Sequence, residues 1–253
     1  MVFEETILKK DGVRRFYSID EISDMRNNNI SEYIKIKDYM YCPECEKPRL
    51  THNLCTERPS YFSTYVHEEH TMDCSLKNEK ANSSLLSSLE DDESLDKLNN
   101  RLKSTLVSLF TDKKSKFNPL IIKTHSVTGD IVTSDFAGST KNYYIPKKRI
   151  TNGLSDDDID TIKIFYGKVC LRCKQIGDSY RLFLINKTNN KSTLICSLYV
   201  SKNVYNHLDI QVNDYFECSI AFYSKISLNL KDNKKYYNSV LTDSRKIVWM
   251  KRQ

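Results

Sequence analysis

The chain has 253 residues, of which 39% are hydrophobic, with a formal net charge of +6 and a mean hydropathy of -0.55. These values suit a soluble protein with room for two modest domains and leave no room for a third. The sequence shows no secretory signal pattern and no apolar run long enough to span a bilayer, so we expect a cytoplasmic protein without disulfides or membrane contact.

The positive charge is concentrated in the carboxyl-terminal part. Residues 161–253 hold 16 Lys and Arg against 6 Asp and Glu, whereas the remainder holds 23 against 27. A basic part joined to a slightly acidic one is typical of proteins that meet phosphate groups, because phosphate contacts release counterions. A solvated lysine surface is the alternative interpretation.

A cluster of metal-ligating residue types lies in the first third of the chain. Cys42 and Cys45 form a C-P-E-C turn, and the later run H-E-E-H-T-M-D-C contains His67, His70 and Cys74. This spacing predicts a tetrahedral zinc site formed by Cys42, Cys45, His70 and Cys74, with His67 as the alternate histidine. Four protein ligands leave no position for water, so we expect a structural site. The two histidines are three residues apart, which excludes the H-E-x-x-H arrangement of metalloproteases.

The motifs around this cluster resemble those of a known family. They are a D-G turn at Asp11, an S-I-D-E-I segment from Ser18, the aromatic-C-P-x-C turn, Tyr61-Phe62 and a closing H-x₃-C. Residues 5–75 are similar to the amino-terminal zinc-binding module of competence CoiA-like proteins. Thr64 stands where that family usually has a histidine. The resemblance implies a DNA-associated module; family members commonly continue into a nuclease-like domain, but no acidic pair followed by E-x-K occurs here.

The middle of the chain predicts one helix and an irregular segment. We divide the chain into a zinc-binding module (1–80), an amphipathic helix (81–112), a connecting segment (113–160) and a carboxyl-terminal domain (161–253). The apolar stripe of the helix recurs at steps of three and four residues and consists of Leu95, Leu98, Leu102, Leu106 and Leu109. Such a stripe more often packs on its own domain than on a second copy. Near the end of the connecting segment, Lys147, Lys148 and Arg149 follow two tyrosines and could hold a phosphate backbone or form a surface loop.

The carboxyl-terminal domain is predicted to be a small β-barrel. Runs rich in β-branched and aromatic residues predict five strands: 162–173, 180–186, 192–200, 215–225 and 235–250. A short helix is expected at 201–208, after the third strand. The order β-β-β-α-β-β is that of the OB-fold, so the whole chain is assigned to the α+β class, with a zinc-ribbon-like module and an OB-like barrel.

OB-folds bind single strands by stacking bases on aromatic side chains beside a basic groove. We assign Phe165, Phe183, Leu198, Phe216, Phe222 and Trp249 to the core. The candidate nucleic-acid-binding residues are Lys147, Lys148, Arg149, Tyr166, Lys168, Arg172, Arg181, Tyr199, Tyr223, Lys234, Lys235, Tyr236 and Tyr237. Which tyrosines face outward depends on strand register, which the sequence does not fix.

Three functions are compatible with these patterns. The first is a non-catalytic protein that binds single-stranded DNA or RNA, or strand junctions, with zinc in a structural role. The second is a protein-interaction module of a phage-defence or counter-defence system. The third is a nuclease related to CoiA-like proteins, for which Asp130, Asp135 and Glu217 are the nearest candidate Mg²⁺ ligands, although their spacing does not favour it. The sequence favours the first and leaves oligomeric state open.

Overall fold

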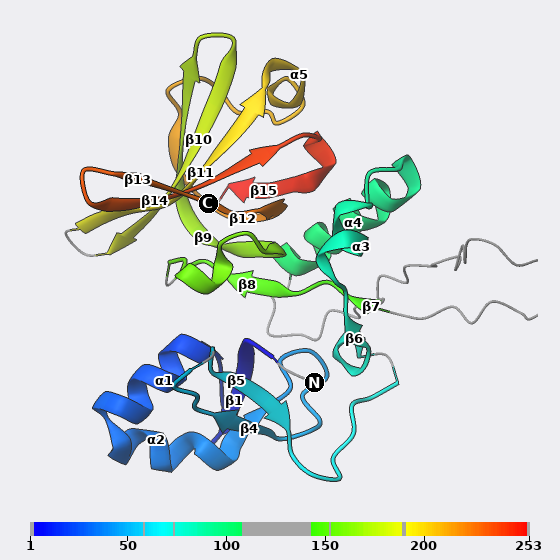
Figure 1. Ribbon diagram of the computed structural model, residues 1–253, viewed down its shortest axis with the longest axis vertical. Coiled ribbons are helices and arrows are strands. Elements are labelled where there is room, and N and C mark those ends of the chain that lie inside the picture. The colour runs from blue at the N-terminus through cyan, green and yellow to red at the C-terminus, as the bar shows by residue number, and fades with distance from the viewer. Residues whose placement is uncertain are drawn as a thin grey trace, which may run out of the picture.

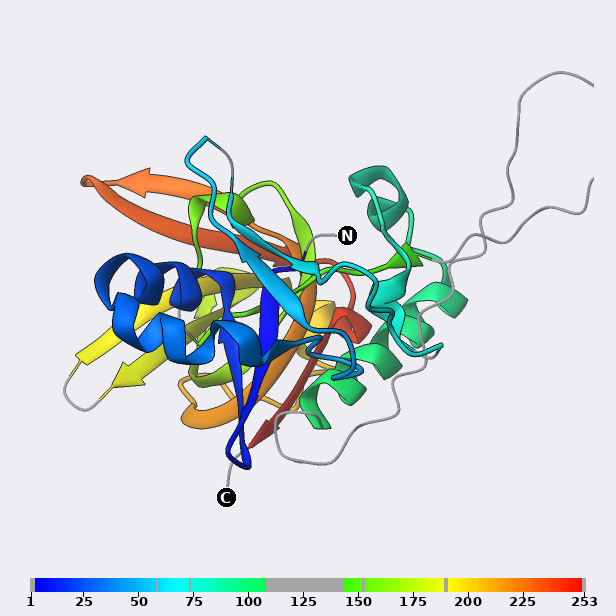
Figure 2. The same ribbon diagram turned by 90° about the horizontal axis from the view of Figure 1, so that it is seen from below.

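The computed structural model describes residues 3–57, 59–72, 74–107, 143–151, 153–188 and 191–251. It has an α+β architecture: a small amino-terminal module, a large and mostly β carboxyl-terminal part, and helices packed beside the large sheet (Figure 1). The helices α1 and α2 lie at one side of the molecule, and α3 and α4 lie at the other (Figure 2).

The amino-terminal module begins with a β-hairpin and two helices. Their bounds are β1 (Glu5–Lys10), β2 (Val13–Ser18), α1 (Ile19–Asn28) and α2 (Ile30–Ile36). Asp11 and Gly12 both have positive φ angles, 50° and 76°, as a tight hairpin turn requires. The Ser18 hydroxyl oxygen accepts a hydrogen bond from the Glu21 N–H, and the Glu21 carboxylate accepts one from the Ser18 N–H, which is a capping box at the start of α1. The sequence interpretation noted this S-I-D-E segment but did not predict the two helices.

A second set of short elements completes the module. They are η1 (Lys37–Tyr39), β3 (Met40–Tyr41), β4 (Leu50–Asn53), β5 (Tyr61–Thr64) and η2 (Ser75–Lys77). The strand β3 pairs with β1, and β4 pairs with β5 as an antiparallel hairpin. Ile22, Met40 and Phe62 are almost fully buried between the helices and these strands. This packing holds the turn after β3 close to the loop after β5.

The central helices pack against the large sheet. The elements here are β6 (Glu79–Lys80), α3 (Ser83–Ser87), α4 (Asp92–Val107), β7 (Tyr143–Tyr144), β8 (Lys147–Arg149) and η3 (Asp156–Asp158). The predicted stripe is confirmed from Leu95 to Leu106: its four leucines are buried in one cluster with Ile164 and Tyr223 of the sheet. Leu109 and the connecting residues 113–142, including Asp130 and Asp135, lie outside the described residues. None of the described helices is long and apolar enough to cross a membrane.

The carboxyl-terminal strands follow the predicted order up to the fourth. Their bounds are β9 (Ile162–Ile176), β10 (Ser179–Thr188), β11 (Lys191–Ser201), α5 (Lys202–Tyr205), β12 (Tyr215–Lys225), β13 (Ser227–Lys231), β14 (Lys234–Leu241), η4 (Ser244–Lys246) and β15 (Ile247–Lys251). The predicted single strand over 235–250 is wrong, because Thr242 and Asp243 end β14 and Asp243 caps η4 before β15 begins. The hairpin strand β13 was not predicted.

The sheet pairing differs in part from the small OB-like barrel that we expected. The strand β9 pairs antiparallel with both β10 and β12, and β11 pairs parallel with β14. In the described residues the sheet runs β13-β14-β11-β10-β9-β12-β15, with β8 added beside β9. In the described residues the two end strands, β13 and β15, do not pair with each other, so the sheet is open.

One face of this curved sheet forms the main core. Phe165, Leu198 and Phe222 are fully buried there, as predicted. Phe216 and Trp249 are partly buried and pack against the same cluster, so their assignment to the core is confirmed in part. Phe183 was assigned to the core as well, but it lies on the opposite face and is only half-buried.

Candidate metal centre and nucleic-acid interface

Four ligand atoms meet between the turn after β3 and the loop after β5. The Sγ atoms of Cys42, Cys45 and Cys74 and the Nδ1 atom of His70 all lie within 4.8 Å of one another. The Sγ atoms of Cys42 and Cys74 are 3.8 Å apart, and the Cys45 Sγ to His70 Nδ1 distance is 3.5 Å. Tetrahedral zinc, with bonds of about 2.3 Å to sulfur and about 2.0–2.1 Å to nitrogen, separates its ligands by about these distances. The four residues therefore form a potential metal site that is compatible with zinc.

The alternate histidine does not take part in this cluster. His67 is exposed, with a positive φ angle of 65°, and it lies outside the group of ligand atoms. The ring of His70 instead packs edge-on against Phe3, with 5.5 Å between ring centroids. That contact fixes the ring with Nδ1 toward the sulfurs.

The thiols of the cluster differ in acidity. The pKa of Cys45 is lowered by its contacts with Cys42 and Cys74. Burial raises the pKa of Cys42 to about 12, and contacts with Cys42 and Cys45 raise the pKa of Cys74. Three ionised sulfurs this close need a cation between them, because like charges in a buried site disfavour one another.

Charged side chains surround the cluster on the side of α4 and β8. Glu44, between the two cysteines of the turn, forms an ion pair of 3.7 Å with Arg101 of α4. The side chains are 6% exposed for Arg101 and 8% for Glu44. Burial and the charge of Arg101 lower the pKa of Lys147 to about 7, and Glu44, Glu5 and Cys74 oppose this effect. These residues were not predicted to lie together.

The second candidate site is the face of the sheet opposite its main core. Register places Arg172, Phe183 and Ser197 in one row across β9, β10 and β11, and Lys174, Arg181 and Tyr199 in the next row. Paired residues of neighbouring strands, and residues two apart in one strand, share a face. We call the group Arg172, Lys174, Arg181, Phe183, Tyr199 and Asn238 the outer face.

Arg181 organises the outer face. Its guanidinium lies over the ring of Phe183, 4.9 Å from the centroid, and over the ring of Tyr199, at 4.6 Å. It also donates a hydrogen bond of 3.2 Å to Asn238. Its Nε atom is buried and has no hydrogen-bond partner in the described residues. A cation held between two half-buried rings forms a planar surface of the kind on which bases stack.

The other predicted nucleic-acid contacts are distributed over several places. Lys168 is exposed on the same side of β9 as Arg172, and Lys234 and Tyr236 share a side of β14 with Asn238. Lys235 and Tyr237 lie on the opposite side, where both contact the carboxylate of Asp156.

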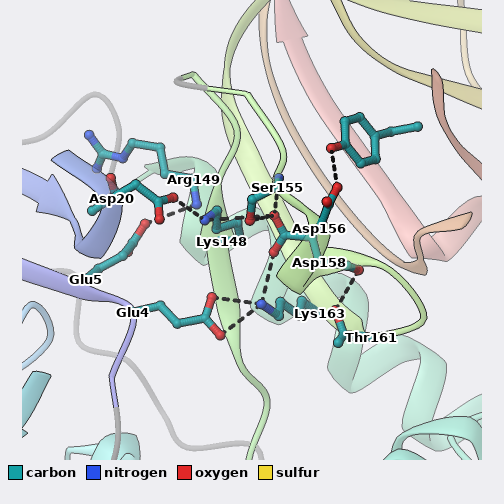
Figure 3. Close-up of polar contacts among 12 residues, drawn as sticks. Glu4, Glu5, Asp20, Lys148, Arg149, Ser155, Asp156, Asp158, Thr161 and Lys163 are labelled. Atoms are coloured by element: carbon teal, nitrogen blue, oxygen red, sulfur yellow. Dashed lines mark hydrogen bonds and ion pairs between the residues drawn. The ribbon is translucent and has the colours of Figure 1, made fainter. Parts of the chain in front are cut away.

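The remaining predicted contacts are buried in the contact between the module and the sheet (Figure 3). Lys148 is 4% exposed, and its Nζ atom lies 2.9 Å from Asp20 and 3.8 Å from Asp158. The backbone N–H of Arg149 donates to Glu5, and the Arg149 guanidinium lies over the rings of Phe16 and Tyr166. In this structure the cationic run of β8 therefore faces the protein's own carboxylates and rings, in contrast to the phosphate contact that we expected.

Two predicted tyrosines are buried as well. The hydroxyl of Tyr166 donates a hydrogen bond of 2.6 Å to Glu5, and that of Tyr223 donates one of 2.7 Å to the backbone carbonyl of Leu86. They are 5% and 4% exposed. Neither ring is available for base stacking in this structure.

The second C-x₂-C pair does not form a comparable cluster. Cys170, Cys173, Cys196 and Cys218 are all buried in the sheet, and burial raises the pKa of Cys173 to about 11 and that of Cys218 to about 12. In the part of the chain that the structure describes, the amino-terminal group alone brings metal-ligating atoms together.

No family model matches this chain, and no curated protein matches it. Among solved structures, it aligns with a chain described as an aspartyl-tRNA synthetase of Leishmania major, with a TM-score of 0.28 and 7% identity. The alignment covers 47% of this chain and 23% of that chain. A likeness this distant carries no argument, so the functional inference rests on the residues themselves. The resemblance of residues 5–75 to CoiA-like proteins stays a prediction.

Proposed function

We propose that this protein is a non-catalytic binder of single-stranded nucleic acid, with zinc as a structural ion in its amino-terminal module. The observation that carries the proposal is the outer face, where Arg181 lies between Phe183 and Tyr199. Single-strand binding needs sequence-tolerant stacking surfaces next to cations that follow the backbone. Arg172 and Lys174, exposed one strand away, supply such cations.

The strand connections support the same proposal. Three antiparallel strands, a short helix, and a later strand parallel to the third are the pairings expected of an OB-type sheet. We infer that the sheet is an open OB variant, in which the β13–β14 hairpin and β15 extend its edges. Such a fold presents an exposed sheet face to oligonucleotides.

The zinc part of the proposal rests on the ligand distances. Cys42, Cys45, His70 and Cys74 would hold zinc from the protein alone, so the ion would stabilise the loops without acting on a substrate. The zinc would connect two loops that are otherwise joined to the module by short strands.

A protein partner is the second candidate. Val240 is 67% exposed on the same side of β14 as Asn238, and Leu230 of the edge strand β13 is 66% exposed. Exposed apolar side chains beside a strand edge that has no partner strand among the described residues favour a protein contact.

Substitution on the outer face separates these functions. Tyr199→Ala and Phe183→Ala should each weaken binding of a labelled single-stranded oligonucleotide, because each stacked base contributes about 1–3 kcal/mol. Tyr39→Ala is the matched control: Tyr39 is 40% exposed with a lysine over its ring, but it lies in the amino-terminal module. Equal affinities for all three variants would contradict the assignment of the outer face.

A further inference from the structure

The metal cluster lies where the amino-terminal module meets the rest of the chain. Glu44 belongs to the ligand turn and Arg101 to α4. The Arg101–Glu44 pair is almost fully buried, with 3.7 Å between Nη2 and Oε2. A buried cation of this kind is unfavourable unless a negative group balances it.

The Glu44 carboxylate supplies that balance, and Glu44 lies between the two cysteine ligands of the turn. A metal ion bound to Cys42 and Cys45 would fix this turn, and with it the position of the Glu44 carboxylate opposite the Arg101 guanidinium.

We propose that Arg101 is a positioning residue that holds the ligand turn on α4 through Glu44, so that metal binding also stabilises the contact of the amino-terminal module with α4. The leucines of α4 are buried against the large sheet, so this ion pair joins the metal site to that sheet. The inference rests on the proposed zinc site and is independent of nucleic-acid binding.

Zinc affinity is the first test. Arg101→Met, in the full chain, should weaken Zn²⁺ binding by about 10–100-fold in competition with a chromogenic chelator, as loss of residues around a metal's ligands does. Arg101→Lys should restore most of the affinity. Lys103→Met is the matched control, because it removes an exposed cation from the same helix. Affinities equal to that control would overturn the inference.

Hydrogen exchange is the second test and does not depend on the variants. Chelation of zinc from the wild-type protein should speed exchange of the amides of α4 near Arg101, in addition to those of the ligand loops. Amides of β10 and β11 should stay protected, which shows that the sheet remains folded. A change confined to residues 40–76 would overturn the inference while leaving the zinc site intact. A purified wild-type protein that binds no zinc would overturn both.

Discussion

Lys163 and Asp158 form a buried ion pair, with 3.0 Å between Nζ and Oδ1 and side-chain exposures of 3% and 0%. The same Nζ atom donates to Glu4 of the amino-terminal module, at 2.8 Å to each carboxylate oxygen. A single lysine therefore joins β9, η3 and the start of the chain (Figure 3).

Replacement of Lys163 should be strongly destabilising. Lys163→Met leaves the buried carboxylate of Asp158 without its closest cation, and removal of one partner of a buried pair costs about 3–5 kcal/mol. Urea denaturation at pH 7 measures the change. Lys235→Met is the matched control, because Lys235 and Asp156 form a pair whose side chains are 50% and 61% exposed. A similar loss of stability in both variants would show that burial does not determine how much the Lys163–Asp158 pair contributes to stability.

Loss of a metal ligand should unfold the amino-terminal module. Cys42→Ser is expected to abolish stoichiometric zinc in the purified protein and lower the melting temperature, because metal binding contributes directly to folding of such modules. Elemental analysis and thermal melting provide the two readouts. His67→Ala should retain zinc, since His67 lies outside the ligand cluster. Zinc that persists in Cys42→Ser but disappears in His67→Ala would reverse the ligand assignment.

The buried His52 should make stability depend on pH. Burial, with a smaller contribution from Arg26, lowers its pKa from 6.5 to about 4. The folded state therefore favours the neutral ring, and this preference contributes to the free energy of unfolding above pH 6.5. The contribution is lost as the pH falls toward 4. Between pH 7 and 5.5 the loss should be about 1 kcal/mol.

The variant His52→Phe tests this dependence. His52 packs against the rings of Tyr33 and Phe62, with centroids 5.7 and 5.8 Å away, so a phenyl ring suits the site. Urea denaturation of both proteins at pH 7 and 5.5, with zinc content checked at each pH, gives the comparison. Parallel losses in the two proteins would assign the pH dependence to other groups.

Charge removal on the outer face should reduce the salt dependence of binding. Each cation that neutralises one phosphate of a single strand contributes about 0.7 to the magnitude of the slope of log affinity against log salt. The double variant Arg172→Gln/Lys174→Gln should therefore reduce the magnitude of this slope by about 1.4. Anisotropy titrations at several salt concentrations measure the slope. Lys103→Gln on α4 should leave it unchanged. A double variant with the wild-type slope would exclude these cations as phosphate contacts.

Local patterns predicted the parts of this structure that depend on neighbouring residues. Ligand spacing identified Cys42, Cys45, His70 and Cys74, and leucine periodicity identified the buried face of α4. Strands β9 to β12 followed from their β-branched and aromatic content. The sequence pattern did not separate β14 from β15 at Thr242 and Asp243, and it did not predict β13, which pairs with β14 across the turn at Asp232 and Asn233.

Long-range pairing could not be predicted in the same way. A run of three cations has the same sequence whether it faces phosphate or buried carboxylates, and Asp20 lies 128 residues before its partner Lys148. The faces of Phe183 and Tyr166 likewise depended on sheet register and on packing of the module. A shift of one residue in the strand register decides whether an aromatic ring lies in the core or on the outer face.

Fluorescence anisotropy of the wild-type protein with labelled single-stranded and duplex DNA and RNA, at two salt concentrations, measures whether the protein binds nucleic acid. We expect tighter binding of single strands than of duplexes, with affinity that falls as salt rises. Absence of oligonucleotide binding at low salt, in a protein that retains its zinc and its fold, would exclude nucleic-acid binding as its function and favour a protein partner.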